Sequence, residues 1–176
     1  PLYPQKEQAE SEALAQDLGL RHQTLTSNEL DIPGFRDNPP ERCYYCKREL
    51  FATLRDVAAS YGMEVVVDGT NADDMSDYRP GRKAGEESGV RSPLMEAGLT
   101  KAEIRELSTR MHLPTADKPA LACLASRIPY GTEITETKLK AVDTVESYLR
   151  EKSFGQCRVR HHGDIARIEV DTEELA

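Results

Sequence analysis

The chain has 176 residues, with 31 acidic against 23 basic side chains, so its formal net charge is −8 at pH 7. No apolar run approaches the roughly 18 residues of a membrane-spanning helix, and we therefore expect no membrane segment and no membrane partner. The acidic balance argues against a general nucleic-acid binder, which carries a basic surface. An apolar content of 38% with interleaved charges favours a folded domain with its own core.

The four cysteines are too sparse for a disulfide-stabilised secreted domain. Two of them, Cys43 and Cys46, form a Cys-x-x-Cys pair, which in a chain without a secretion signal indicates metal binding or catalysis. We therefore expect a cytoplasmic protein. The chain starts at Pro1 without an initiator Met and enters a helical pattern directly, so we expect it to be an excerpt of a longer protein.

The first half of the chain predicts two helices separated by a loop. Spaced apolar residues predict an amphipathic helix over residues 6–18, ended by Gly19. A short extended stretch is expected over 21–26, followed by a loop over 27–40. The second helix is expected to begin with Asn38 as its N-cap and a proline in its first turn, and to end at Gly62. Its inward stripe is predicted to be Leu50, Leu54, Val57 and Tyr61.

A doubly wound, mostly parallel α/β sheet is the expected fold of this region. The β-branched run at 64–67 is predicted to be a buried parallel strand, and a polar loop with Gly69, Thr70 and Asn71 follows it. Ligands of such sheets bind at the carboxyl ends of the strands. Residues 74–98 are expected to form a surface loop.

The second half predicts two more helices and a hairpin. Thr100 and Glu103 form a capping box for a helix with Ile104, Leu107 and Met111 inward. A loop over 114–131 is expected to join two bodies. The next helix opens at Thr135 and ends near Gly155, with an inward stripe of Leu139, Val142, Val145 and Leu149.

Gly163 and Asp164 predict a two-residue hairpin turn, which fixes the pairing of the flanking strands. One face of that hairpin gathers core residues, Cys157, Val159, Ile168 and Val170. The other gathers Arg158, Arg160, Arg167 and Glu169, with Arg160 opposite Arg167. Two interpretations stay open: a site for an anion such as phosphate, which arginine binds in a bidentate manner, or a solvated face on which Glu169 relieves the repulsion.

Several segments together resemble the LarE family of ATP-dependent sulfur transferases in the PP-loop (adenine nucleotide alpha hydrolase-like) superfamily. They are Arg-Cys-Tyr-Tyr-Cys-Lys at 42–47, Asp-Gly-Thr-Asn at 68–71, Asp-Tyr-Arg-Pro-Gly at 77–81, Cys-Leu-Ala-Ser-Arg-Ile-Pro-Tyr-Gly at 123–131 and Asp-Ile-Ala-Arg-Ile-Glu at 164–169. The resemblance runs from about Pro1 to about Val170. It implies a PP-loop, HUP-like domain over residues 1–131 without its first strand and phosphate loop, and part of a C-terminal substrate-binding α+β domain over 132–176.

The resemblance implies adenylation of a carboxylate of pyridinium-3,5-biscarboxylic acid mononucleotide and its replacement by sulfur, in nickel-pincer nucleotide cofactor biosynthesis. ATP with Mg²⁺ would lie near Gly69, Thr70 and Asn71. Some members sacrifice the cysteine that matches Cys123, and others hold a [4Fe–4S] cluster on three cysteines, here Cys43, Cys46 and Cys123. By the same match, the substrate phosphate would be held by Arg127, Arg158 and Arg160.

The resemblance also implies a homo-oligomer, often a hexamer, with a small-molecule nucleotide as its substrate. The acidic net charge predicts no nucleic-acid partner. Two alternatives stay open. PP-loop tRNA thiolation enzymes combine a Cys-x-x-Cys with a third cysteine, although the net charge of −8 counts against tRNA binding. A non-catalytic zinc-binding module would use the same cysteines with a fourth ligand.

Overall fold

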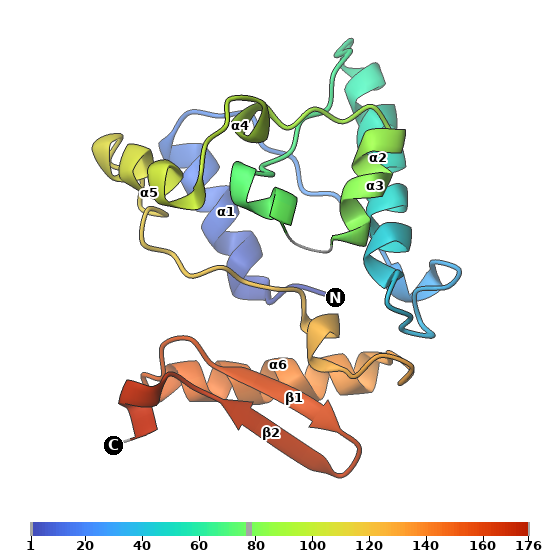
Figure 1. The fold of residues 1–176 in the computed structure, drawn as a ribbon, viewed down its shortest axis with the longest axis vertical. Helices are drawn as coiled ribbons and strands as arrows, with labels where there is room; N and C mark the ends of the chain where they lie inside the picture. Colours follow the sequence, from blue (N-terminus) through green and yellow to red (C-terminus); the bar gives the residue numbers. More distant parts are fainter. Residues whose placement is uncertain (1, 77–78, 176) are drawn as a thin grey trace. The chain divides into compact units, whose positions relative to one another are not determined.

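The computed structural model describes residues 2–76 and 79–175, so Asp77 and Tyr78 of the Asp-Tyr-Arg-Pro-Gly segment, and the end residues Pro1 and Ala176, lie outside the described residues. Within them the fold is α/β, with six α-helices, four 3-10 turns and one two-stranded antiparallel sheet (Figure 1). None of the described helices is both long and apolar enough to cross a membrane.

The contacts divide the chain into two compact units, which are described separately. Unit 1 combines Pro1–Pro39 with Pro119–Ala176, and unit 2 is Pro40–Lys118. The predicted division into residues 1–131 and 132–176 differs from these units, because residues 1–39 cluster with the C-terminal segment. That domain division stays a prediction.

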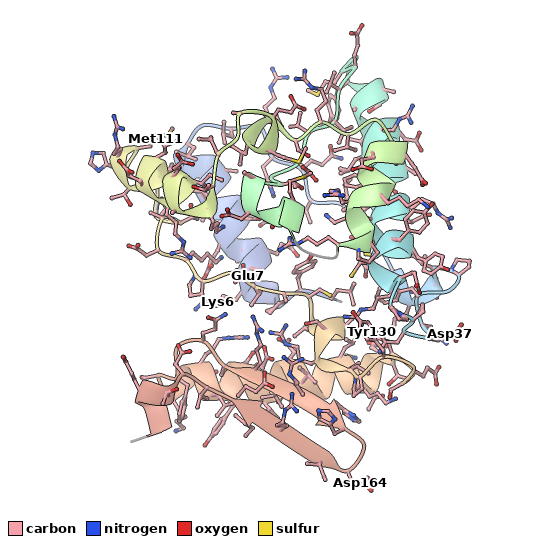
Figure 2. The ribbon with its side chains drawn as sticks, in the orientation of Figure 1. Lys6, Glu7, Asp37, Met111, Tyr130 and Asp164 are labelled. Carbon is pink, nitrogen blue, oxygen red and sulfur yellow. The ribbon has the colours of Figure 1, made fainter. Side chains whose placement is uncertain are left out.

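Unit 1 is built around helix α6 (Glu136–Glu151) and a β-hairpin (Figure 1). Thr135 caps α6 by accepting a hydrogen bond from the Lys138 amide, and Leu139 and Val142 are buried, as predicted. Val145, which was predicted on the same inward stripe, is exposed instead. Strands β1 (Arg158–His162) and β2 (Ile165–Glu169) pair in the predicted register, and β1 packs on α6. Asp164 lies at the tip of the hairpin (Figure 2).

The predicted core face of the hairpin is confirmed in part. Cys157 and Val159 are buried, at 4% and 3% exposure. Ile168, by contrast, is 51% exposed, because β2 is the outer strand and its residues 165–168 all face solvent. The prediction that Ile168 is a core residue was therefore wrong.

The rest of unit 1 comprises helix α1 (Gln5–Asp17), the turns η1 (Glu29–Asp31), η3 (Leu124–Arg127) and η4 (Thr172–Leu175), and connecting loops. Asn38 was predicted to be a helix N-cap, but the N-cap of α2 (Arg42–Ser60) is Glu41. Asn38 is fully buried with φ +55°, and its amide donates to the carbonyls of Ile128, Pro129 and Thr132 at 2.7–3.2 Å. Asn38 therefore closes the loop beyond η3 against the N-terminal segment.

Unit 2 contains α2 (Arg42–Ser60), η2 (Ala72–Ser76), α3 (Pro80–Glu87), α4 (Pro93–Glu96) and α5 (Lys101–Arg110). The capping box at Thr100 is confirmed, since its side chain accepts from the Glu103 amide and the Glu103 carboxylate accepts from the Thr100 amide. Phe51 is the buried anchor of α2, at 3% exposure, and contacts α3 at Gly85.

Four predictions for unit 2 were wrong. The inward stripe of α2 is centred on Phe51, and Leu50 and Tyr61 are exposed. On α5, Leu107 and Met111 are exposed as well. Residues 74–98 are not one loop, because α3 and α4 both begin there at a proline. The run at 64–67 is not a buried strand: Val67 makes one parallel bridge with Arg91 and is 58% exposed.

Candidate functional site

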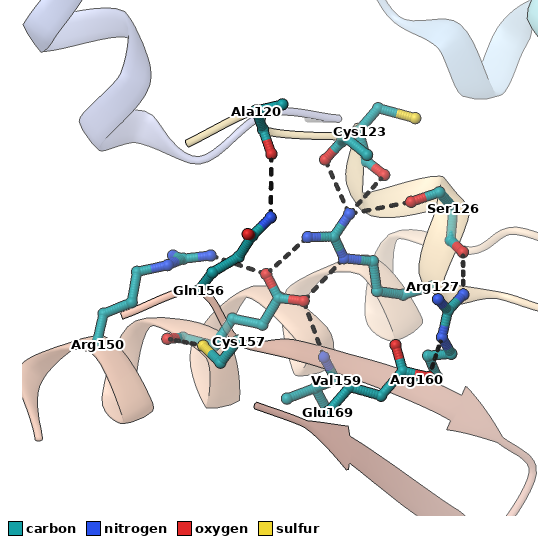
Figure 3. A network of polar contacts seen from close by, with 12 residues as sticks. Ala120, Cys123, Ser126, Arg127, Arg150, Gln156, Cys157, Val159, Arg160 and Glu169 are labelled. Carbon is teal, nitrogen blue, oxygen red and sulfur yellow. Dashed lines mark hydrogen bonds and ion pairs between the residues drawn. The ribbon is translucent and has the colours of Figure 1, made fainter. Parts of the chain in front are cut away.

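Cys123 stands at the entrance to the short turn η3 in unit 1. It is half-buried and extended, with φ −60° and ψ 148°, and the two residues after it are buried. The amide of Leu124 donates to the carbonyl of Leu2 at 2.9 Å. The backbone on either side of Cys123 is thus fixed, while its side chain points away from the guanidinium of Arg127 (Figure 3).

Arg127 ties the Cys123 turn to helix α6. Its side chain is 2% exposed and makes a two-point ion pair with the fully buried Glu146, at 2.8 Å from Nε and 3.1 Å from Nη2. The remaining nitrogen, Nη1, donates to the carbonyls of Ala122 and Cys123 and to the hydroxyl of Ser126 (Figure 3). Charge-assisted bonds of this two-point kind are strong and directional.

Glu146 also connects the turn to the hairpin. Its Oε1 accepts a hydrogen bond from the Val159 amide at 2.9 Å, and its Oε2 accepts from Arg150 at 2.8 Å. Glu146 was not among the residues predicted from the sequence. A signal was present, because Glu146 lies four residues after Val142 and three before Leu149, on the apolar side of the helix.

Arg158, Arg160, Arg167 and Glu169 form one face of the hairpin, which we call the arginine face. Glu169 accepts hydrogen bonds at 2.7 Å from both Arg160 and Arg167, and Arg160 also donates to the Ser126 carbonyl at 3.4 Å. The bond from Arg160 outweighs desolvation and, with that from Arg167, lowers the pKa of Glu169 to about 2. The arginine face and the Cys123 turn therefore share a direct contact.

Cys43 and Cys46 lie in the first turns of α2 in unit 2, where the sequence predicted them. Both are half-buried, and all four cysteines of the chain are described and form no disulfide. Helix α3 approaches this part of α2 closely at Gly81. A Cβ atom there would lie 3.0 Å from Cγ of Lys47 and 3.3 Å from the carbonyl oxygen of Cys43.

A surface hollow of about 530 Å³ lies beside the Cys-x-x-Cys pair, between α2 and α3. Its walls include the two tyrosines between the cysteines, Tyr44 and Tyr45, and the cations Arg79, Arg82 and Lys83. Tyr44 donates to Glu87 at 2.6 Å, and this bond raises the pKa of the phenol. This hollow was not predicted from the sequence, since a loop was expected where α3 lies.

The Asp-Gly-Thr-Asn loop in unit 2 is ordered by its own polar side chains. Asp68 accepts hydrogen bonds from Ser92 at 2.7 Å and from the amide and hydroxyl of Thr70, and these outweigh burial and lower its pKa. Asn71 is 8% exposed and accepts from the Asp73 amide. A Cβ atom at Gly69 would meet nothing within 4 Å, so the loop is open at that position.

The predicted site residues thus fall into two groups. Unit 1 holds Cys123, Arg127, Arg158 and Arg160, and hydrogen bonds to the Cys123 turn come from Arg127 and Arg160. Unit 2 holds Cys43, Cys46, Gly69, Thr70 and Asn71. Within the described residues, no three His, Cys, Asp or Glu side chains are grouped as a metal site would require.

No family model matches the chain. It is 45% identical over 97% of its length to an uncharacterized protein of Synechocystis, and 36% identical over 89% to one of Methanocaldococcus jannaschii. It is 39% identical over 96% of its length to a protein of Lactiplantibacillus plantarum named pyridinium-3,5-bisthiocarboxylic acid mononucleotide synthase. The chain spans 61–63% of the length of these relatives. This similarity along almost the whole chain supports the resemblance to the LarE family that the sequence motifs indicate.

Proposed function

We propose that this protein is an ATP-dependent sulfur transferase that converts a carboxylate of pyridinium-3,5-biscarboxylic acid mononucleotide into a thiocarboxylate, a step toward a nickel-pincer nucleotide cofactor. The observation that carries the proposal is the 39% identity, over 96% of the chain, to a protein named as the synthase of the bisthiocarboxylic acid product. The hydrogen bonds that join the Cys123 turn to the arginine face support it, because a thiol and a cluster of arginines then belong to one unit.

The proposed reaction has two balanced steps. A carboxylate oxygen of the substrate attacks the α-phosphorus of ATP and pyrophosphate leaves, which gives an acyl-adenylate. A sulfur nucleophile then attacks the acyl carbon, a C–S bond forms, and AMP leaves with the electrons of the C–O bond. ATP with Mg²⁺ is assigned to the loop of Gly69, Thr70 and Asn71, whose backbone and polar side chains are ordered in unit 2.

In this proposal Arg158 and Arg160 contact the substrate phosphate, since both lie on the arginine face of β1. Arg127 contributes differently from the sequence-based expectation. Its guanidinium is already engaged with Glu146 and with the carbonyls of the turn, so we assign it to holding the Cys123 turn in place beside Arg160. A direct phosphate contact of Arg127 would require it to leave a fully buried carboxylate.

Cys43, Cys46 and Cys123 are proposed as ligands of a [4Fe–4S] cluster. The donor set fits, because all three are half-buried cysteines without a disulfide and thiolates are the usual ligands of such clusters. Three protein ligands leave one iron that can carry an external sulfide. If the protein holds no cluster, Cys123 is the proposed sulfur donor. Its Sγ displaces AMP from the acyl carbon to give a thioester, and loss of the Cys123 α-proton then breaks the Cβ–Sγ bond, which releases the thiocarboxylate and leaves dehydroalanine.

The test is anaerobic incubation of the full-length protein with the substrate, ATP, Mg²⁺ and sulfide, with products followed by mass spectrometry. We expect AMP, pyrophosphate and a nucleotide in which one oxygen is replaced by sulfur. ATP consumption without a thiocarboxylate product would contradict the proposal. A salt-dependent shift of tRNA on native gels would favour the tRNA thiolation alternative.

A metal analysis of the same preparation tests the ligands. We expect about four irons per chain, and Cys43→Ser, Cys46→Ser and Cys123→Ser each to abolish iron retention. Cys157→Ser is the matched control and should retain iron, because its thiol is buried against the Glu146 carbonyl in the core. About one tightly bound zinc in place of iron would favour the zinc-module alternative. Light scattering on the same protein tests the proposed homo-oligomer, a hexamer in the expected case.

A further inference from the structure

The arginine face contains an internal counter-ion. Arg160 and Arg167 lie directly opposite each other in the β-ladder, where like charges repel. A single oxygen of Glu169, Oε1, accepts a hydrogen bond from each of them, at 2.7 Å from Nε of Arg160 and 2.7 Å from Nη2 of Arg167. Glu169 therefore holds two guanidinium groups side by side that would otherwise move apart.

This carboxylate also sets the net charge of the face. Three guanidinium groups and one carboxylate, which is ionised at neutral pH, sum to +2. Arg158 lies opposite Glu169 in the ladder, and within the described residues its side chain makes no hydrogen bond or ion pair with Glu169. The face thus carries two uncompensated positive charges in a chain whose formal net charge is −8.

The arginine face is accessible to a ligand. The side chain of Arg167 is 57% exposed and that of Arg160 is 30% exposed. Arg160 uses Nε for Glu169 and Nη1 for the Ser126 carbonyl, so its outer nitrogen Nη2 makes no hydrogen bond within the described part of the chain. A guanidinium held at two points in this way offers a fixed donor to an anion.

We propose that Glu169 is a specificity-determining residue of the arginine face, which selects the dianion of a phosphomonoester over more highly charged polyphosphates. A phosphomonoester carries between one and a half and two negative charges near neutral pH, which a face of charge +2 neutralises. A triphosphate would bring surplus negative charge close to the carboxylate of Glu169. The inference rests on the proposed phosphate site and deepens it: an enzyme that binds both a mononucleotide and ATP has to keep ATP off the mononucleotide site.

The experiment measures the affinities of ribose 5-phosphate and inorganic tripolyphosphate by calorimetry, each with the full-length protein. Binding is attributed to the arginine face where the affinity measured for Arg160→Ala is lower than that of the wild-type protein. We expect Glu169→Gln, which removes the counter-charge, to raise the affinity for tripolyphosphate relative to ribose 5-phosphate by about tenfold. Glu169→Asp restores the charge and should keep the ratio close to the original.

Asp164→Asn is the matched control. It changes the net charge by the same amount but lies in the turn at the tip of the hairpin (Figure 2), so the affinity ratio should not change. Three results would overturn the inference. The first is an unchanged affinity ratio in Glu169→Gln together with weaker binding in Arg160→Ala, which would support the phosphate site but not its selectivity. Asp164→Asn shifts the ratio equally, which indicates a general charge effect. Arg160→Ala leaves both affinities unchanged, and then the proposed phosphate site itself fails.

Discussion

The two units hold their cysteines in different ways. In unit 1, Cys123 lies on a turn that is fixed by a buried ion pair, since Arg127 and Glu146 are 2% and 0% exposed. In unit 2, Cys43 and Cys46 lie on a helix, and the ion pairs on neighbouring α3 are on the surface, with side chains 38–71% exposed. A helix positions a side chain by its own backbone hydrogen bonds, whereas a turn needs partners from other elements. Substitutions should therefore affect the two regions through different contacts.

The largest expected effect is that of Glu146→Ala. It leaves the guanidinium of Arg127 buried without its carboxylate and removes the acceptor of the Val159 amide, so we expect a loss of about 3–5 kcal/mol in the free energy of unfolding. Urea unfolding followed by circular dichroism measures it. Glu136→Gln, which breaks the exposed pair with Lys140 on the same helix, is the control and should have no measurable effect. A loss as small as the control's would mean that the buried pair does not hold the turn.

Gly81→Ala should have the next largest effect, in unit 2. The new methyl group would meet the Lys47 side chain at 3.0 Å and the Cys43 carbonyl at 3.3 Å, so α3 must move or Lys47 must change rotamer, at a cost of about 1 kcal/mol. The control is Gly69→Ala, because a methyl group there meets no atom within 4 Å. Equal stability of the two variants in urea unfolding would show that α2 and α3 are not in close contact at Gly81.

The helix caps allow a direct comparison of the units. Thr100 of α5 has a reciprocal capping box, while Thr135 of α6 accepts one bond, at 3.3 Å from the Lys138 amide. Replacement of either by alanine should cost about 1 kcal/mol. The larger loss is expected at Thr100, because its hydroxyl both accepts from the Glu103 amide and donates to the Glu103 carboxylate. Thermal unfolding of both variants, with Thr100→Ser as the conservative control, measures the difference. A larger loss at Thr135 would contradict the ranking.

The smallest effect is a pH dependence of the hairpin. The pKa of Glu169 falls from an ordinary 4.5 to about 2 on folding, so its bonds to Arg160 and Arg167 contribute stability above pH 4.5 that is lost as the pH falls toward 2. Glu169→Gln should flatten the decline of the melting temperature over this range. The wild-type and Asp164→Asn proteins should keep the decline. An identical slope in all three proteins would show that Glu169 does not stabilise the hairpin.

The hairpin and α6 could be predicted from the sequence because local signals were sufficient. Gly163 and Asp164 set the turn, the alternation of Val159 with arginines set the faces, and Leu139 and Val142 set the buried side of α6. Two kinds of feature could not be predicted from local sequence signals. The role of Glu146 was not predicted, since its partners Val159 and Arg127 lie 13 and 19 residues away in the sequence.

The helices in 74–98 were missed for a different reason. α3 and α4 are short, with eight and four residues, and their proline starts at Pro80 and Pro93 were outweighed by the glycines around them. The prediction of a buried strand at 64–67 was wrong because a β-branched run favours a strand without showing whether a partner covers it. Among the described residues, Val67 pairs with Arg91 alone. Whether the cysteines of the two units bind one cluster depends on contacts between segments far apart in the chain, which local patterns do not contain.

The alternation on β1 has a consequence for folding accuracy. If β1 slipped by one residue against its neighbours, Arg158 and Arg160 would turn toward the apolar side of α6, and Cys157 and Val159 would turn to solvent. Two buried, unpaired guanidinium groups would make that arrangement far less stable than the native one. The arginines that we assign to phosphate therefore also protect the hairpin against misfolding, and replacing both with apolar residues would admit alternative pairings even in the absence of any ligand.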